Sequence, residues 1–153
     1  MNKLIIGLEV HIQLNTKSKI FCSCPNPANL NEENLQPNTL CCPTCLGLPG
    51  AKPTFNKKVL EEALKVALAL NCRINEEIFF SRKTYFFPDM PQNYQITQYE
   101  EPLGLEGEFQ GIAIKRIHME EDPGKLIHKI NLVFIDYNRS GTPLIEIVTE
   151  PQF

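Results

Sequence analysis

The stretch IGLEVHIQL, residues 6–14, alternates apolar and polar side chains without interruption. A period of two residues is typical of a β-strand with one buried and one solvated face. The predicted buried face carries Ile6, Leu8, Val10, Ile12 and Leu14. The opposite face carries Gly7, Glu9, His11 and Gln13. This pattern predicts a fold built on a sheet, with polar groups presented together on one side.

One helix and three further strands are expected downstream. Apolar residues recur at helical spacing after Pro53 and predict an amphipathic helix from Asn56, the N-cap, to about Leu70. Residues 112–118, 132–137 and 144–148 are strand candidates, and the last two look like neighbours joined by a tight connection. The sum is an α+β fold, with a mixed, mostly antiparallel sheet and one main helix.

Three segments carry weaker signals. Residues 78–99 are rich in aromatics but are interrupted by Pro88 and Pro91, which predicts a strand, a loop and a short strand. Residues 103–111 are polar and glycine-rich and predict a turn region. Residues 21–53 show no sustained period, so this excursion needs a staple to become ordered.

The composition indicates a single domain over residues 1–153. Of these 153 residues, 42% are hydrophobic and 22% are charged, which excludes a largely disordered chain. The net charge of −3 excludes a global basic field that could hold nucleic acid, so any phosphate contact must be local. The sequence shows no signal peptide, long apolar run or lipidation motif, and we expect a cytoplasmic protein without membrane association.

Four of the six cysteines form two tight pairs, C-S-C at 22–24 and C-P-T-C at 42–45. Cytoplasmic thiols stay reduced, so paired cysteines favour a metal over a disulfide. The spacing predicts a structural zinc knuckle closed by Cys22, Cys24, Cys42 and Cys45. Free buried thiols are the alternative. Cys41 could replace Cys42 as a ligand, and Cys72 is expected to be a small core residue.

Acidic side chains recur where strands are predicted. Glu9 and His11 share the polar face of the first strand, the acidic run 120–122 follows the strand 112–118, and Glu146 lies in an apolar run. An unpaired buried carboxylate is costly, so such groups need a cation nearby. Oxygen ligands with few imidazoles favour Mg²⁺. A solvated sheet face and an exposed acidic turn are the alternatives.

Cations lie beside aromatic rings where Arg82 and Lys83 precede Tyr85, with Tyr94 and Gln95 following. Such a mixture can hold a nucleotide or a stacked base. The alternative is an aromatic mini-core with two exposed cations. The sequence contains neither a P-loop nor a dinucleotide-binding glycine motif.

Six blocks together resemble GatB, the family of B subunits of the tRNA-dependent aspartyl/glutamyl amidotransferases. The blocks are IGLEVH at 6–11, CPTCLGLPG at 42–50, RKTYFFPD at 82–89, YQITQ at 94–98, RIHMEED at 116–122 and DYNRSGTPLIE at 136–146. They occur in the family's order and cover nearly the whole chain, so they are far more specific together than any one of them alone.

The resemblance implies an ATP-dependent, glutamine-hydrolysing amidotransferase of translation, a carbon–nitrogen ligase. Glutamate misacylated on tRNA(Gln), or aspartate on tRNA(Asn), is phosphorylated with Mg-ATP, and ammonia then displaces the phosphate. The A subunit of the family's complex, an amidase-type glutaminase, supplies the ammonia, and a small C subunit completes a heterotrimer. Misacylated tRNA is therefore the expected nucleic-acid partner, and no DNA partner is expected.

The resemblance also implies roles for individual residues. The metal-site motif positions are matched by Glu9, His11, Glu121 and Glu146. Second choices at the cofactor are Glu120 and Glu150. Lys83 matches a lysine on the ammonia entry route. The expected nucleotide contacts are Arg82, Tyr85, Tyr94 and Gln95, and the four paired cysteines match a zinc knuckle that some family members have.

Family members continue into the rest of a catalytic cradle and into helical domains that grip the tRNA. We therefore expect residues 1–153 to form the N-terminal part of such a cradle, with residues 22–45 as a zinc-knuckle insertion. The tRNA-binding helical domains are absent from this stretch, and the chain alone is expected to be inactive. Its rivals are a non-catalytic zinc-knuckle binding module and a fragment that only docks on partner subunits.

Overall fold

The computed structural model describes residues 4–31 and 35–152. Its elements are, in chain order, β1 (Glu9–Gln13), η1 (Pro27–Asn29), α1 (Lys57–Ala69), β2 (Arg73–Ile74), β3 (Ser81–Thr84), β4 (Tyr94–Thr97), β5 (Gly104–Phe109), β6 (Ile112–Glu121), β7 (Lys125–Lys129), β8 (Leu132–Asp136) and β9 (Pro143–Thr149). The expected α+β class with one main helix is confirmed. No helix in the described ranges has the length and apolar character needed to cross a membrane.

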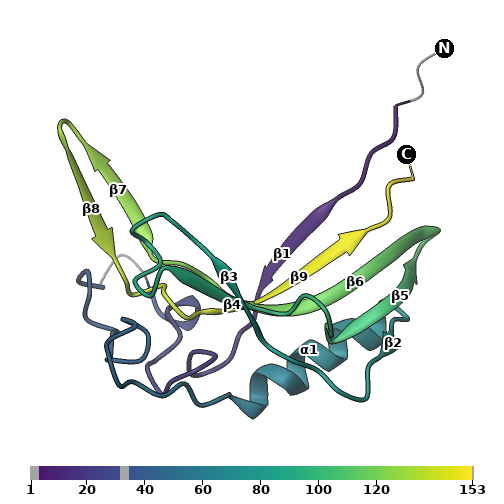
Figure 1. The fold of residues 1–153 in the computed structure, drawn as a ribbon, viewed down its shortest axis with the longest axis horizontal. Helices are drawn as coiled ribbons and strands as arrows, with labels where there is room; N and C mark the ends of the chain where they lie inside the picture. The colour runs from purple at the N-terminus through teal and green to yellow at the C-terminus, as the bar shows by residue number, and fades with distance from the viewer. Residues whose placement is uncertain (1–3, 32–34, 153) are drawn as a thin grey trace.

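The central sheet has the strand order β1-β9-β6-β5-β2, and every pairing in it is antiparallel (Figure 1). Two separate two-stranded sheets, β3–β4 and β7–β8, complete the strands of the described chain. The predicted pairing of β8 with β9 was wrong, because β8 pairs with β7, a strand that the sequence analysis did not predict. Asn131 adopts a φ of 63° between them, as the tight turn of a hairpin requires.

Helix α1 forms where its local signals predict it. The Asn56 side chain accepts a hydrogen bond from the Lys58 backbone N–H at 2.9 Å, and Asn71 adopts a φ of 54° just after the C-cap. The helix lies along one face of the sheet, next to β2 and β6 (Figure 1). Its fully buried side chains, Val59, Ala63 and Ala67, join a core that includes Ile117, Met119 and Ile145.

The predicted burial of the first strand was largely wrong. Leu14 is buried at 6% exposure, but Val10 is 44% exposed, and Ile6, Leu8 and Ile12 are exposed as well. The physical reason is position: β1 is an edge strand, and α1 packs beside β2 and β6, away from β1. Residues 6–8 extend β1 without belonging to it, although Leu8 and Thr149 still form hydrogen bonds with each other.

The turn region expected at 103–111 is mostly a strand, β5. Its glycines serve close packing. A Cβ atom on Gly107 would lie 2.5 Å from the Cys72 sulfur and 2.6 Å from the Leu70 carbonyl oxygen, so only glycine fits here. Glycine at position 107 is thus required by a tertiary contact with the end of α1, and a local sequence pattern cannot predict such a contact.

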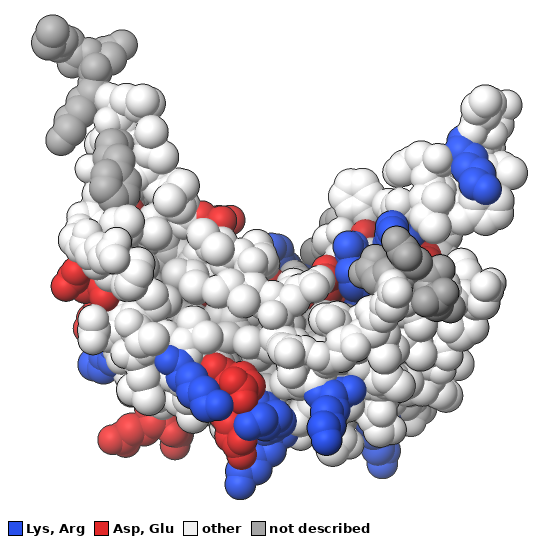
Figure 2. All heavy atoms as spheres, turned by 180° about the vertical axis from the view of Figure 1, so that it is seen from behind, with Lys and Arg blue, Asp and Glu red and all other residues white. Residues whose placement is uncertain are grey.

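Two projections rise from the body and leave a hollow between them. One is the β7–β8 hairpin, and the other is formed by the outer ends of β1 and β9 (Figure 1). The view from behind shows the hollow at the upper edge, while many charged side chains gather at the lower edge, where α1 lies (Figure 2). Lys58 and Lys65 form ion pairs with Glu61 and Glu62 on α1.

Candidate functional site

Three adjacent strands build the candidate site through their register. Glu146 of β9 lies opposite His11 of β1 on one side and opposite His118 of β6 on the other. Directly opposed residues of antiparallel strands project from the same face, so these three side chains form a row. Glu120 follows His118 by two residues and therefore joins the same face.

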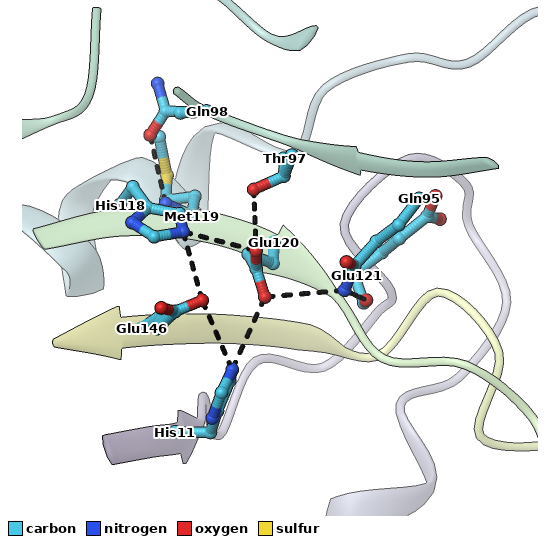
Figure 3. A network of polar contacts seen from close by, with 9 residues as sticks. All are labelled: His11, Gln95, Thr97, Gln98, His118, Met119, Glu120, Glu121 and Glu146. Carbon is cyan, nitrogen blue, oxygen red and sulfur yellow. Dashed lines mark hydrogen bonds and ion pairs between the residues drawn. The ribbon is translucent and has the colours of Figure 1, made fainter. Parts of the chain in front are cut away.

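The four side chains converge in a compact network (Figure 3). The His11 Nε2 lies 3.5 Å from Glu120 Oε2 and 3.4 Å from Glu146 Oε2. The His118 Nε2 lies 3.2 Å from Glu120 Oε1 and 3.2 Å from Glu146 Oε2. One ligand atom each from His11, Glu120 and Glu146 lies within 4.8 Å of the others, which suits a single metal ion.

Glu120 is held in place by the β4 strand that covers it. The Thr97 hydroxyl donates a hydrogen bond to Glu120 Oε1 at 2.6 Å, and Gln95 Nε2 lies 3.4 Å from Glu120 Oε2. Gln95 also donates to the Glu121 backbone carbonyl at 2.9 Å. Glu120 is only 3% exposed, so its carboxylate is oriented by protein groups before any ligand arrives.

The network raises the pKa of its buried histidine and lowers the pKa values of its two carboxylates. Although burial opposes the charged imidazole, the adjacent Glu120 and Glu146 carboxylates raise the pKa of His118. The hydrogen bond from His118 lowers the pKa of Glu146 to about 2. Despite its burial, the pKa of Glu120 is also lowered, by the hydrogen bonds from His118 and Thr97. Both carboxylates are therefore ionised at neutral pH.

Glu121, expected among the metal ligands, lies on the opposite face of β6. Its Oε1 accepts hydrogen bonds from Gln92 Nε2 at 2.8 Å and from the Ile96 backbone N–H at 2.9 Å. The geometry therefore brings Glu120, the second choice, to the cluster instead of Glu121, because neighbours along a strand point to opposite faces. Burial raises the pKa of Glu121 to about 7.

A cavity of about 580 Å³ adjoins the cluster and collects several other predicted residues. Its lining includes Glu9, Arg82, Lys83 and Gln95 together with His11, His118, Glu120 and Glu146. The lining thus combines these carboxylates with two cations of β3, Arg82 and Lys83. Glu9 lines the cavity but lies outside the three-residue metal cluster.

Three expected nucleotide residues are not in the lining of this cavity. Tyr94 lines a smaller neighbouring cavity, where the Arg82 guanidinium lies 4.8 Å from its ring centroid. The Tyr85 hydroxyl lies 3.5 Å from Asp89 Oδ2, and the Tyr85 ring packs edge-on against Phe87. Glu150 follows β9 and lies beyond the cavity, because the strand carries it past the cluster. The aromatic mini-core alternative therefore describes Tyr85 better than nucleotide contact does.

The four paired cysteines meet in a second cluster. Sulfur atoms of Cys22, Cys24, Cys42 and Cys45 lie within 4.8 Å of one another. Cys45 Sγ is 3.8 Å from Cys42 Sγ and 4.0 Å from Cys24 Sγ. Tetrahedral zinc with Zn–S bonds of about 2.3 Å requires sulfur separations of about 3.8 Å, so the spacing fits this ion.

The surroundings of the cysteines agree with a cation at their centre. The hydrogen bond with Cys22 lowers the pKa of Cys45 to about 4, whereas burial raises the pKa of Cys24 to about 12. Four thiolates this close repel one another unless a cation neutralises them. Cys41 lies outside the cluster with its sulfur 3.9 Å from Asn138 Oδ1, and Cys72 is buried in the core, as expected.

His118 is the site residue that the sequence analysis missed. Two signals were available in the sequence: His118 and Glu120 have the same strand parity, and both fall in the RIHMEED block. What the sequence does not give is the register that sets His118 opposite Glu146.

Comparison with known proteins matches residues 4–153 to the family described as the GatB/GatE catalytic domain. The chain belongs to the GatB/GatE catalytic domain family. It is 51% identical to the B subunit of the aspartyl/glutamyl-tRNA(Asn/Gln) amidotransferase of Persephonella marina, over 96% of this chain and 32% of that protein. It is 53% identical to the B subunit of the corresponding enzyme of Methanospirillum hungatei, over 96% of this chain and 33% of that protein.

This GatB/GatE catalytic domain spans about a third of the length of the curated relatives that it matches. The cluster of His11, Glu120 and Glu146 and the four-cysteine cluster both lie within the matched range. The match therefore covers both candidate metal centres and all the lining of the cavity beside the first of them.

Proposed function

We propose that this chain is the N-terminal part of the catalytic cradle of a tRNA-dependent amidotransferase. The substrate is glutamate on tRNA(Gln) or aspartate on tRNA(Asn), and the product is the corresponding amide. The observation that carries the proposal is the convergence of His11, Glu120 and Glu146 at a cavity whose lining also includes Arg82 and Lys83.

The reaction needs activation because a free carboxylate has a poor leaving group. The carboxylate oxygen takes the γ-phosphoryl group of ATP and ADP leaves, which gives an acyl phosphate. Ammonia then attacks the acyl carbon, and phosphate leaves as the amide forms. His11, Glu120 and Glu146 would hold Mg²⁺, and the bound ion would neutralise the charge that develops on the transferred phosphoryl group. This site needs no P-loop, because carboxylates on rigid strands orient the cation.

The chain's own residues divide the remaining work. Arg82 and Lys83 supply positive charge opposite the carboxylates, which favours an anionic nucleotide in the cavity. We also assign Lys83, which lines this cavity, to the route by which ammonia from a glutaminase partner would enter. Glu9, which lines the cavity, is a further candidate for polar contact with the bound nucleotide and its cation.

The four cysteines serve structure in this proposal. Four protein ligands leave no open position on zinc, so the ion would only fold the excursion over residues 22–45. The relatives are B subunits by name, which implies partners in a larger enzyme. We expect the complete protein to act with a glutaminase A subunit and a small C subunit in the cytoplasm, where thiols stay reduced.

A chimera tests the proposal directly. Residues 4–153 replace the matching third of the Persephonella marina relative, which is then assembled with its partner subunits and assayed for ATP-dependent amidation of glutamyl-tRNA. We expect activity in the chimera and a loss of at least about 100-fold for Glu146→Gln or His11→Ala, since each removes a cation ligand.

The matched control is Glu106→Gln, because Glu106 is an exposed carboxylate paired only with Arg73. It should retain the chimera's rate. The proposal is wrong if an assembled chimera is inactive, or if Glu146→Gln turns over as fast as Glu106→Gln. The binding of Mn²⁺ to the 153-residue chain, followed by electron paramagnetic resonance, gives an independent readout of the cluster.

A further inference from the structure

The cavity beside the metal cluster has another stretch of lining with no role in the proposed function. Gln98, Tyr99 and Arg116 form it. Gln98 and Tyr99 come at the end of β4, and Arg116 comes from β6. Two of these side chains place buried hydrogen-bond donors at the cavity and leave them without partners.

Gln98 has one half of its carboxamide engaged and the other half free. The residue is 1% exposed, and its Oε1 accepts a hydrogen bond from the Met119 backbone N–H at 3.0 Å (Figure 3). Because an N–H can only donate, this bond fixes which end of the amide is oxygen. The Nε2 is buried and has no partner among the described residues. A buried donor left unpaired costs free energy unless a ligand meets it.

Arg116 has the same need and adds a charge. It precedes His118 by two residues on β6, so its side chain leaves the strand on the cavity face. Its guanidinium lies 5.6 Å from the Tyr99 ring centroid, and its buried Nε is unpartnered. The positive charge of Arg116 contributes to the lowered pKa of Glu146, but across residues 4–31 and 35–152 no direct ion pair involves Arg116. A guanidinium is always charged and offers only donors, so an anion is the direct partner that it lacks.

We infer that Arg116 and Gln98 form an oxyanion-binding subsite, with Tyr99 as a platform beneath the guanidinium. The inference rests on the proposed function and deepens it. Glu120 and Glu146 take a cation, while Arg116 and Gln98 take an oxyanion in the same cavity. The backbones of Arg116 and Glu120 are about 13 Å apart along the strand, and both residues line the cavity.

A ligand that satisfies both ends carries a metal-coordinating oxygen group and a second oxyanion a few ångströms away. Two sources have this chemistry: a phosphoryl group of the nucleotide and the carboxylate of the acyl group to be amidated. Both accept hydrogen bonds from a bidentate guanidinium and from an amide N–H. Pyrophosphate and glutarate represent the two sources as probes.

The test measures binding of each probe to the 153-residue chain by isothermal titration calorimetry. Gln98→Glu is a close isostere that keeps an acceptor for the Met119 N–H but replaces the free donor with a repelling oxygen. Arg116→Gln removes the charge. We expect each variant to weaken binding of at least one probe by about tenfold or more. Loss for pyrophosphate alone identifies a phosphoryl subsite, and loss for glutarate alone identifies a carboxylate subsite.

Lys115→Gln is the matched control, because Lys115 is the exposed neighbouring cation at the bulge of β6 and is not in the lining of the cavity. It should change binding less than twofold. The inference is overturned if the wild-type chain binds neither probe, or if Arg116→Gln weakens binding no more than Lys115→Gln does. Thermal melting checks that each variant is folded, and Arg116→Lys, which keeps the charge without the planar fork, should retain intermediate affinity.

The Mn²⁺ measurement separates this inference from the proposed function. If Mn²⁺ binds but the Arg116 and Gln98 variants bind the probes normally, only the subsite is wrong. If Mn²⁺ does not bind but the variants lose affinity for a probe, the subsite holds and the metal site fails. The Arg116→Gln and Gln98→Glu chains should bind Mn²⁺ within about twofold of the wild type, since neither residue is in the metal cluster.

Discussion

At the scale of single residues, His118 shows how one buried side chain can organise two others. Its Nε2 contacts both Glu120 and Glu146, which also form the candidate cation site. An imidazolium at this position balances two carboxylates when no cation is bound. The two carboxylates therefore have a cationic partner within the protein itself.

The raised pKa of His118 predicts a pH-dependent stability. The folded state binds the proton more tightly than the unfolded state, so its stabilising effect is full below the ordinary histidine pKa of 6.5 and is lost as pH rises through the folded pKa. In buffer free of Mg²⁺, His118→Gln should cost more free energy of unfolding at pH 6 than at pH 9, as measured by urea denaturation. His128→Gln, at an exposed position of β7, should show no such difference. An equal cost for His118→Gln at both pH values would contradict the assigned charge.

Glu121 predicts the same direction of pH dependence but a substitution that stabilises the chain. Burial raises its pKa from 4.5 to about 7, so the folded state holds the proton more tightly and loses stability as pH rises between these values. Glu121→Gln mimics the protonated form and should stabilise the chain by about 2–3 kcal/mol at pH 8, with little gain at pH 5. Urea denaturation at both pH values measures this. A destabilising effect at pH 8 would mean that the charged carboxylate has a partner that these contacts do not include.

At the scale of elements, the contribution of a local signal, the N-cap of α1, can be tested directly. Asn56 caps the helix through its side-chain oxygen, and its Nδ2 donates to Ser18 and Lys19 of the preceding excursion. Asn56→Ala should lower the free energy of unfolding by about 2 kcal/mol, because both roles are lost. Asn56→Asp keeps the capping oxygen and should cost about half as much. Equal costs for the two variants, measured by urea denaturation, would show that the cap itself contributes nothing.

How far an element could be predicted depended on where its determining contacts lie. The bounds of α1 follow from an N-cap, a helical period and Asn71, all within its own sequence. The choice between Glu120 and Glu121 depends on the register of β6 against β9, which pairs residues about 30 positions apart. The segment of β5 was wrongly predicted to be a turn. Its Gly107 is required by close packing against Cys72 and Leu70, which lie more than 30 residues earlier.

The pairing of hairpins was harder to predict than the presence of strands. Residues 132–136 were correctly expected to be extended, but their apolar run contains no period that identifies a partner. The same holds for the burial of β1: its alternation correctly separates the two faces, whereas exposure depends on α1 stopping short of this edge. The four cysteines needed no register, because two short spacings already bring them together in pairs.

At the scale of the whole molecule, the excursion before α1 has little regular structure, and backbone bonds hold the residues at its two ends. The Ile20 backbone N–H donates to the Gly141 carbonyl, and those of Thr54 and Asn56 donate to the Phe21 and Ile20 carbonyls. The excursion contains one short 3-10 helix, η1, and one isolated bridge among its described residues. The four-cysteine cluster joins its two ends and thus closes the loop that they span.

Loss of this cluster should therefore loosen the excursion while leaving the sheet intact. Cys24→Ser is expected to lower the melting temperature by about 5–10 °C, to release zinc, and to open residues 22–45 to limited proteolysis. Cys41→Ser is the matched control, because Cys41 is adjacent in sequence but outside the cluster. The structural role is refuted if the two serine variants melt together and retain the same zinc content.

The position of β1 has one more consequence. A strand at the rim of a sheet offers a row of main-chain donors and acceptors to any extended peptide that reaches it, and here the rim also carries exposed Val10 and Ile12. These are the ingredients of edge-to-edge self-association, the first step toward a filament. At high protein concentration, monomers should therefore associate into oligomers through β1, and Val10→Lys should prevent this association.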